Sequence, residues 1–276
     1  HGYALGYERV NDHTPSNAGP RHRLWRIRAK QIVTATGAIE RPLSFAGNDI
    51  PGVMLASAVR DYAVNFGVSV GDRTVVVTNN DDAYLTAIAM KNAGLDVPAI
   101  LDARASANGD LVQQAIDMGI RVEFGRAIAA VKGGKRVTGV KVCAQIGEGA
   151  VLSEIECEAV AMSGGWSPVV HLWSHCGGKL NWDVEQQMFR PDATRPPTSH
   201  DGEAMVTVAG IANGYLDLNS VLQDADSAGK NAAKAAGSKP KATKAPTASE
   251  ATVAPMEPVW LMPQGAPIKK RMKAWL

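Results

Sequence analysis

The hydrophobic and polar positions of the first fifty residues predict short strands separated by loops. Two runs, Tyr3–Val10 and Arg23–Val33, alternate polar and apolar residues on either side of a loop rich in proline, glycine and asparagine. This alternation predicts a β-hairpin or a pair of meander strands. The second run continues into a short apolar strand, Gln31–Ala35, which a loop marked by proline and glycine follows at 41–52.

The next stretch alternates strand and helix periods. Arg73–Thr78 is a continuous run rich in β-branched residues, which is typical of a strand buried on both faces. Asp81–Asn92 places its apolar residues at helical spacing. The following elements are a strand at Leu95–Leu101, a helix at Leu111–Met118 capped by Asn108 or Asp110, and a strand at Arg121–Phe124. This β-α-β-α-β order predicts a doubly wound parallel sheet.

Beyond this unit the pattern returns to short strands and ends in one helix. The predicted elements are two strands around the Gly133-Gly134 turn within 127–142, strands at Glu154–Met162 and Met205–Gly210, and a helix at Ser220–Ala236 capped by Asn219 or Ser220. Residues 237–258 are rich in lysine, proline, alanine, threonine and serine, and this composition predicts a solvated linker.

Composition narrows the functional classes. A length of 276 residues predicts about two domains. The formal net charge of +2 leaves no basic excess for a nucleic acid, and no apolar run is long enough to predict a membrane helix. Three cysteines predict a reducing compartment, and hence a cytoplasmic protein. The chain begins at His1 and ends without a stop signal, so we expect it to be cut at both ends.

Two strand-to-turn segments carry candidate binding chemistry. In the first, a strand ends at Ala35, Thr36 and Gly37, where small residues let a ligand approach the backbone closely. With the downstream Arg-Pro and Pro-Gly pairs, it resembles the crossover segment of flavoprotein reductases with two dinucleotide domains. In the second, Val206–Gly214 leads through a glycine turn into a helix whose N-terminal amides suit a phosphate. The alternative for the first segment, if its Ala-Thr-Gly is taken alone, is any tight turn after a strand. The alternative for the second segment is an ordinary glycine turn before a surface helix.

The turn after the buried strand lacks a phosphate cradle. A dinucleotide fingerprint needs glycines where this chain has Thr78, Asn80 and Ala83, and Asp81 at the helix start would repel a pyrophosphate. Asp102 lies near the place where an acid usually meets a ribose hydroxyl, but an aspartate after a strand is commonly a plain cap, so this acid alone is weak evidence. The unit therefore has the β-α-β-α-β order of a dinucleotide-binding domain but lacks the glycine turn that would hold a phosphate. Nucleotide binding by this unit itself remains the alternative.

Metal and thiol chemistry are not predicted. His171 and His175 have helical i, i+4 spacing beside Cys176, but no further ligand has convincing spacing, so we predict no metal. Cys143 and Cys157 are isolated, and the absence of a Cys-x-x-Cys motif argues against a thiol relay. No Ser/His/Asp set or carboxylate pair can be assigned, so no catalytic residue is predicted.

Four blocks of the sequence are distinctive: Arg23–Pro42, Pro51–Val59, Thr78–Tyr84 and Ala161–Gly178. Together they resemble the alpha subunit of heterotetrameric sarcosine oxidase, and the resemblance covers roughly residues 1–236. Related amine- and opine-oxidising complexes share the layout. The resemblance implies two nested, Rossmann-like FAD/NAD(P)-binding domains of the disulfide-reductase type in an α/β fold, the first of them incomplete. It implies a discontinuous nucleotide-binding domain at 1–50 and 150–236 and an inserted domain at 51–149. A linker at 237–258 and the start of a truncated C-terminal domain at 259–276 would follow.

The same resemblance implies a function. Such a complex demethylates sarcosine oxidatively to glycine, forms hydrogen peroxide and passes the one-carbon unit to tetrahydrofolate. Alpha holds a non-redox NAD, beta carries FAD, FMN lies at the alpha–beta interface, and gamma and delta complete the complex. The NAD contacts carried over by position are Ala35, Thr36, Gly37, Gly210, Ile211, Leu216 and Leu218. Alternatives are an opine-, proline- or amine-oxidising complex, a scaffold with a vestigial nucleotide site, and an independent flavin reductase. This chain alone is expected to be inactive.

Overall fold

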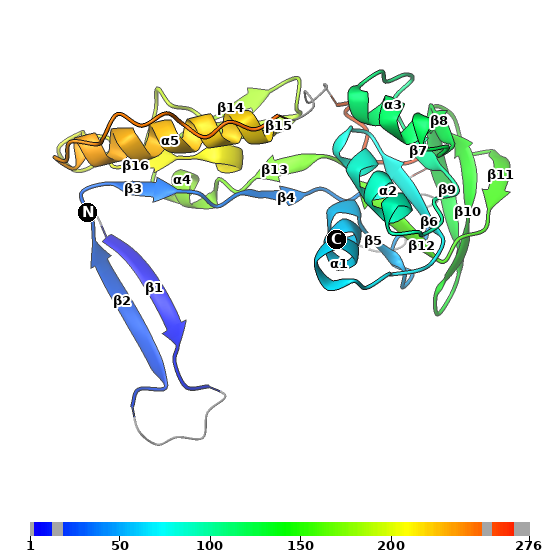
Figure 1. Ribbon diagram of the computed structural model, residues 1–276, viewed down its shortest axis with the longest axis horizontal. Helices are drawn as coiled ribbons and strands as arrows, with labels where there is room; N and C mark the ends of the chain where they lie inside the picture. The colour runs from blue at the N-terminus through cyan, green and yellow to red at the C-terminus, as the bar shows by residue number, and fades with distance from the viewer. Residues whose placement is uncertain (1–2, 13–18, 250–255, 268–276) are drawn as a thin grey trace. The chain divides into compact units, whose positions relative to one another are not determined.

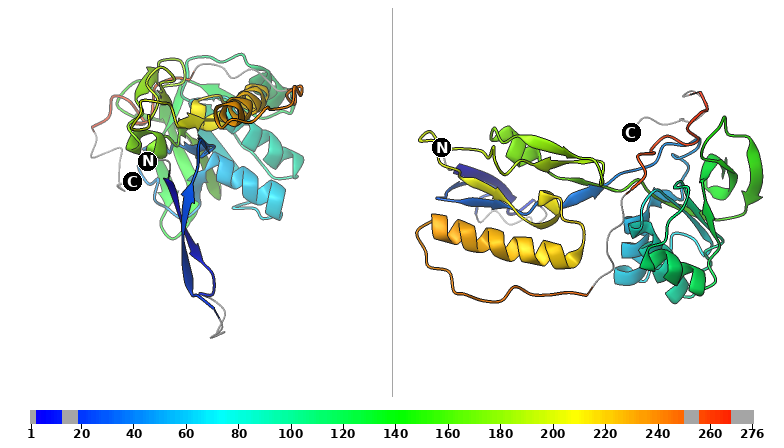
Figure 2. Two further views of the ribbon diagram at one scale, coloured as in Figure 1. Left: turned by 90° about the vertical axis from the view of Figure 1, so that its left-hand side faces the viewer. Right: turned by 90° about the horizontal axis from the view of Figure 1, so that it is seen from above.

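The computed structural model describes residues 3–12, 19–249 and 256–267. These residues form two compact units (Figures 1 and 2). Unit 1 contains the described residues of 3–38, 168–182 and 189–249, and unit 2 contains 39–167, 183–188 and 256–267.

Unit 2 is built on a five-stranded parallel sheet in the order β5-β12-β6-β7-β8. These strands are β5 (Val53–Leu55), β12 (Ala159–Ser163), β6 (Thr74–Thr78), β7 (Ile100–Asp102) and β8 (Val122–Phe124). The helices of the unit are α1 (Ala56–Phe66), α2 (Asp82–Asn92) and α3 (Asp110–Asp117). An antiparallel sheet, β11-β10-β9, completes it with β9 (Arg126–Gly133), β10 (Val137–Ala144) and β11 (Val151–Ile155).

Strand β6 explains the layering of unit 2. Its five residues are all buried. Val75 and Val77 join the core formed with β9 and β10, whereas Val76 joins the core formed with the helices. The parallel sheet therefore lies between the helices and the antiparallel sheet, as Figure 1 shows. The β-branched run predicted this two-sided burial, and the structure confirms it.

Two strand predictions differ from the structure. Strand β7 begins only at Ile100, because Pro98 lacks the N–H that a ladder needs. The run predicted as one strand at 154–162 is two strands, β11 and β12, in different sheets. The chain turns between them, where Glu158 N donates to Arg73 O at 2.8 Å.

Unit 1 has smaller pieces. Strands β1 (Tyr3–Arg9) and β2 (His22–Arg28) form an antiparallel hairpin, and β3 (Ile32–Thr34) pairs in parallel with β16 (Val206–Val208). Around them lie α4 (His171–His175), a 3-10 turn η1 (Gly210–Asn213) and α5 (Leu218–Ala235). Two further pairs lie where the chain passes between the units: β4 (Ala38–Glu40) with β13 (Trp166–Pro168), and β14 (Leu180–Asp183) with β15 (Met188–Pro191).

The hairpin of unit 1 exposes large apolar side chains. Leu5, Tyr7, Leu24, Trp25 and Ile27 are each about half exposed or more. The register pairs Tyr7 with Leu24 on one face and Gly6 with Trp25 on the other, so both faces carry apolar surface. An isolated two-stranded hairpin is marginally stable in water.

The unit borders differ from the predicted domain borders near 50 and 150. The structure divides the chain after residues 38 and 167, because β5 and β12 both belong to the sheet of unit 2. The described part of 259–276 also lies in unit 2. Residues 239–249 follow α5 back along its length (Figure 2), where Lys230 Nζ donates to Thr243 O at 2.5 Å and Gln223 Nε2 to Pro246 O at 3.0 Å. Among the described residues, no helix has the length and apolar character of a membrane span.

Candidate functional site

The structure brings the two predicted binding turns of unit 1 together. Strands β3 and β16 run in parallel, and Ala209 N donates to Thr34 O at 3.0 Å. The turns that leave these strands, at Ala35 and at Gly210, therefore begin at the same edge. Residues 32–37 and 206–211 are thus neighbours although they are far apart in sequence, and together they are here called the platform.

The first turn, at 35–37, is largely exposed, and hydrogen bonds to Val169 hold its backbone in place. Ala35 and Thr36 are exposed, and Gly37 adopts a φ of 71°. Thr36 Oγ1 donates to Val169 O at 2.7 Å, and Val169 N donates to Gly37 O at 2.9 Å. A β-carbon at Gly37 would meet no heavy atom within 4 Å. The backbone is therefore held in place and remains open to close approach.

The second turn is closed by a carboxylate that the sequence did not single out. Asp224, on α5, accepts hydrogen bonds from Gly210 N at 2.7 Å and from Asn213 Nδ2 at 3.1 Å. Gly210 is buried and Ile211 is half-buried. No sequence signal identifies Asp224, because its role depends on one turn of α5 facing a turn fourteen residues earlier.

The N-terminus of α5 is capped by Asp217 rather than by the predicted Asn219 or Ser220. Asp217 accepts a hydrogen bond from Ser220 N at 2.8 Å, and this bond holds the pKa of Asp217 below its ordinary value. Leu216 is half-buried just before the cap, and Leu218 is 48% exposed as the first residue of α5. Since Ser220 N already has a carboxylate acceptor, this helix start is less available to a phosphate than predicted.

In unit 2, the polar groups of the turn at 78–82, which takes the place of a dinucleotide fingerprint, hydrogen-bond to one another. Thr78 Oγ1 accepts from Asn80 N at 3.1 Å, and Asp82 N donates to Asn80 Oδ1 at 3.0 Å. Asp102, the predicted ribose acid, is fully buried and accepts from Tyr84 Oη at 2.7 Å. This acid is therefore withdrawn from the solvent.

Arg104 is the second functional-looking residue that the sequence did not single out. Its guanidinium lies 2.7 Å from Asp81 Oδ1 and 2.7 Å from Asp102 Oδ2, and all three side chains are almost fully buried. Burial alone would lower the pKa of Arg104, but hydrogen bonds and the charges of Asp102 and Asp81 raise it above its ordinary value. A signal was present in retrospect, since an arginine follows the strand-end aspartate by two residues.

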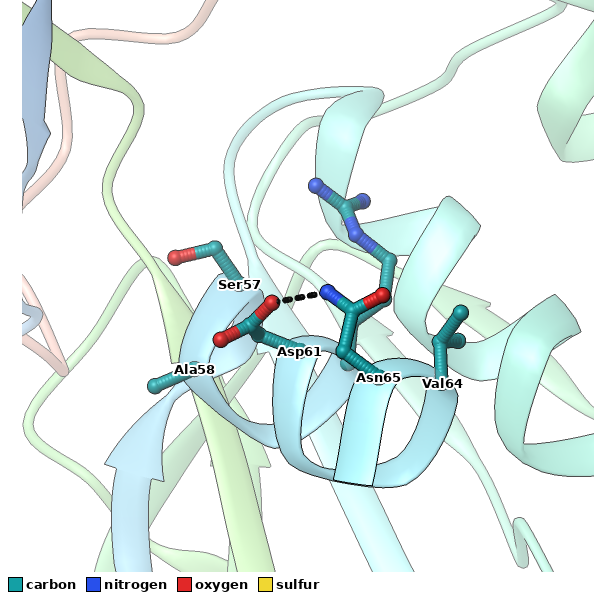
Figure 3. Close-up of a pocket in the computed structure, with 6 residues that line it drawn as sticks. Ser57, Ala58, Asp61, Val64 and Asn65 are labelled. Atoms are coloured by element: carbon teal, nitrogen blue, oxygen red, sulfur yellow. Dashed lines mark hydrogen bonds between the residues drawn. The ribbon is translucent and has the colours of Figure 1, made fainter. Parts of the chain in front are cut away.

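The remaining candidates form no site among the described residues. His171 and His175 both lie on α4, but no group of three or more potential metal ligands comes together in the described part of the chain. A shallow hollow on the surface of α1 is shown in Figure 3, where Asn65 Nδ2 donates to Asp61 Oδ1. The residues lining it are Ser57, Ala58, Arg60, Asp61, Val64 and Asn65.

Comparison with curated proteins finds relatives along most of the chain, although no protein-family model matches it. The chain is 37% identical over 268 residues to the sarcosine oxidase alpha subunit of Corynebacterium sp. strain P-1, and 38% identical over 269 residues to that of strain U-96. Each match covers 95% of this chain and 27% of the relative. One opine oxidase subunit, from Agrobacterium tumefaciens strain Ach5, is 27% identical over 76% of this chain and 44% of its own length. The chain thus spans about a quarter of the sarcosine oxidase subunits it matches.

Comparison with solved structures identifies the fold. Thioredoxin reductase of T. acidophilum superposes with a TM-score of 0.57 at 19% identity, covering 78% of this chain and 68% of that one. L-proline dehydrogenase of P. horikoshii superposes with a TM-score of 0.51 at 20% identity, covering 79% of this chain and 37% of that one. These likenesses confirm the predicted α/β fold of the dinucleotide-binding, disulfide-reductase type.

Proposed function

Because the chain belongs to the family of the sarcosine oxidase alpha subunits, we propose that it is part of the NAD-binding alpha subunit of a complex that oxidatively demethylates sarcosine to glycine. The complex would form hydrogen peroxide and pass the one-carbon unit to tetrahydrofolate. The observation that carries this proposal is the match to sarcosine oxidase alpha subunits along nearly the whole chain. Catalysis belongs to an assembly with beta, gamma and delta subunits, and this chain alone is expected to be inactive.

The platform of unit 1 supports an NAD contact. Ala35 and Thr36 are small and exposed, and Gly37 has open space at its β-carbon position, which fits a ligand lying close to the main chain beside the Gly210 turn. Gly210 N already donates to Asp224, so this turn does not present that amide to a phosphate. We therefore expect these residues to contact the uncharged portion of the dinucleotide, with Ile211, Leu216 and Leu218 adding apolar cover.

The flavins of the proposed complex, FAD in beta and FMN at the alpha–beta interface, would supply the oxidation chemistry when bound. The described residues of this chain present no catalytic set of their own. Cys143 and Cys157 are buried, and burial raises the pKa of each to about 11. Buried thiols of this kind do not support a thiol relay at neutral pH.

A related substrate is the second candidate. The match to an opine oxidase subunit covers three quarters of this chain, and it favours a secondary-amine oxidation even if sarcosine is not the substrate. The test is to extend the chain to the full length of its relatives, co-express it with the partner subunits and measure peroxide formation. Sarcosine-dependent turnover supports the proposal. Turnover with an opine or with proline alone would move the protein to a sister complex.

NAD retention separates a working subunit from a scaffold with a vestigial site. The purified complex should release NAD on denaturation, as measured by mass spectrometry, and Gly37→Val should lose most of it. Gly67→Val is the matched control, because Gly67 also has a positive φ and open space around its β-carbon position but lies at the end of α1 in unit 2. An empty wild-type extract would favour the scaffold.

A further inference from the structure

The carboxyl edge of the unit 2 sheet is where a doubly wound fold binds its ligand. In this chain that edge lies at the ends of β12, β6 and β7, which are Ser163, Thr78 and Asp102. A dinucleotide there would need free amides at a helix start, a backbone without side chains in its way, and an acid for the ribose.

The helix starts at this edge already hold the chain's own acceptors. Ser57, in the first turn of α1, donates from N at 2.9 Å and from Oγ at 2.6 Å to Glu40 Oε2. Asp82 N, at the start of α2, donates to Asn80 Oδ1. Glu40 is buried, and burial raises its pKa above the ordinary value. A phosphate would therefore meet satisfied amides and buried carboxyl groups rather than free donors.

Asp102, the acid that could bind a ribose, already has partners, and a loop of the chain fills the space beside it. Asp102 holds Arg104 and Tyr84, and Arg104 also pairs with Asp81. A β-carbon at Gly109 would lie 2.7 Å from Asp81 Oδ2, so the next loop packs directly on this cluster. Both carboxylates, Asp81 and Asp102, are therefore already paired with a guanidinium of the same chain.

A peptide segment of the same chain covers the edge. Residues 256–262, here called the closing segment, run across the ends of β6 and β12. Asn79 Nδ2 donates to Glu257 O at 2.9 Å and to Val259 O at 3.0 Å. Trp260 Nε1 donates to Gly164 O at 2.8 Å. The side chains of Val259 and Met262 are buried in the core between the two sheets of unit 2.

The motifs of this edge fit a peptide better than a nucleotide. Gly164 is required because a β-carbon there would lie 2.9 Å from Trp260 Cδ1 and 3.0 Å from Arg41 O. The Arg41 guanidinium lies 5.1 Å from the centroid of the Trp260 ring, which is a cation–π contact. Ser44 N donates to Trp260 O at 2.7 Å, and Met262 N donates to Ser44 O at 2.8 Å. Three sequence motifs, around Arg41, Asn79 and Gly164, thus converge on one extended peptide.

We propose that the carboxyl edge of unit 2 is a peptide-docking site in place of a nucleotide site, and that its ligand is the extended backbone and indole of the closing segment. Asn79 recognises the carbonyl groups of alternate residues, and Gly164 with Arg41 receives the indole. Unit 2 then binds no dinucleotide. This inference goes beyond the proposed function, because that proposal places NAD binding in unit 1 and says nothing of unit 2.

The first test is photolabelling of the assembled complex with an azido-adenine analogue of NAD, followed by peptide mapping. We expect no label in 74–104 or in 256–262. Label in either segment would overturn the proposal and leave NAD binding by the subunit intact. Label in unit 1 supports both proposals. Absence of label throughout supports the closed edge and counts against the proposed NAD binding.

The second test asks whether the named contacts hold the closing segment. Asn79→Leu removes two hydrogen bonds to the closing segment, and Trp260→Ala removes one hydrogen bond together with the cation–π contact of Arg41. Each variant should therefore raise amide hydrogen exchange within 256–262 about tenfold. Trp182→Ala is the matched control, since Trp182 is 47% exposed and packs on Phe189 in unit 1. Exchange in 256–262 equal to that of the wild type in both variants would overturn the proposal. If either variant unfolds, exchange will rise throughout β6 as well, and Trp260→Phe, which removes the Nε1 donor but keeps an aromatic ring, then serves as the milder replacement.

Discussion

Replacing Arg104 with methionine should destabilise unit 2 far more than any surface charge replacement. Methionine keeps much of the aliphatic volume but leaves Asp81 and Asp102 facing each other in a buried site. Asp102 retains only neutral donors, the hydroxyl of Tyr84 and the Arg104 backbone N–H. Removing one partner of a buried ion pair costs about 3–5 kcal/mol. Local opening of the sheet edge should therefore become at least about a hundredfold more frequent.

The assay is hydrogen exchange of the purified 276-residue chain, read in peptides from β6, β7 and α2. Arg73→Met is the matched control, because Arg73 forms an ion pair with Asp96 at 3.0 Å in which both side chains are about half exposed. Exposed pairs of this kind contribute about 0–1 kcal/mol. The triple variant with Asp81→Asn and Asp102→Asn should recover much of the loss, since it removes the unpaired charges. Equal exchange in Arg104→Met and Arg73→Met would refute the reasoning.

Three further outcomes follow from buried and half-buried groups. Glu40→Gln should raise the melting temperature at pH 8, and this difference from the wild type should shrink towards pH 4. The reason is that the pKa of Glu40 is raised in the folded chain, so the stability that Glu40 contributes is lost as the pH rises. A difference in melting temperature that is independent of pH would contradict this. A thiol reagent at pH 8 should modify Cys176 alone in the folded chain, since Cys143 and Cys157 are buried with raised pKa values, and three equivalents of rapid labelling would count against it. Asp224→Ala should cost about 1–2 kcal/mol and reduce NAD retention, as measured by thermal unfolding and mass spectrometry of the complex, because two donors lose their acceptor. Asp226→Ala, on the same helix, should do neither.

The sequence predicted the parts of the fold that local pattern determines. The valine run of β6 predicted burial on both faces because neighbouring side chains point to opposite sides of a strand. That the turns after β3 and β16 lie together was implied by the family resemblance rather than by local pattern, and parallel pairing of those strands places them at one edge. Whether that edge binds NAD stays a prediction.

The residues that sequence reasoning missed all owe their roles to contacts with other elements of the chain. Asp224 is an ordinary helical aspartate until α5 packs beside η1, and Arg104 gains its role only when Asp81 arrives from the start of α2. The composition of 237–258 predicted a solvated linker, yet Glu257 donates from its backbone N to Asn79 O at 3.3 Å. No local pattern identifies such partners, because they come from elements far apart along the chain.

The pairing of β3 with β16 sets an order of events during synthesis on the ribosome. About 170 residues separate the two strands, and nearly all of unit 2 lies between them. At roughly 5–20 residues per second, β3 would wait about 10–35 s for its partner to emerge. During that interval the apolar hairpin of β1 and β2 has no completed unit to join, whereas the strands of unit 2 can already pair. The sheets of unit 2 are therefore expected to form first, and the closing segment, which emerges after β16, completes their core last. A chaperone that shields the nascent hairpin would favour correct closure of unit 1.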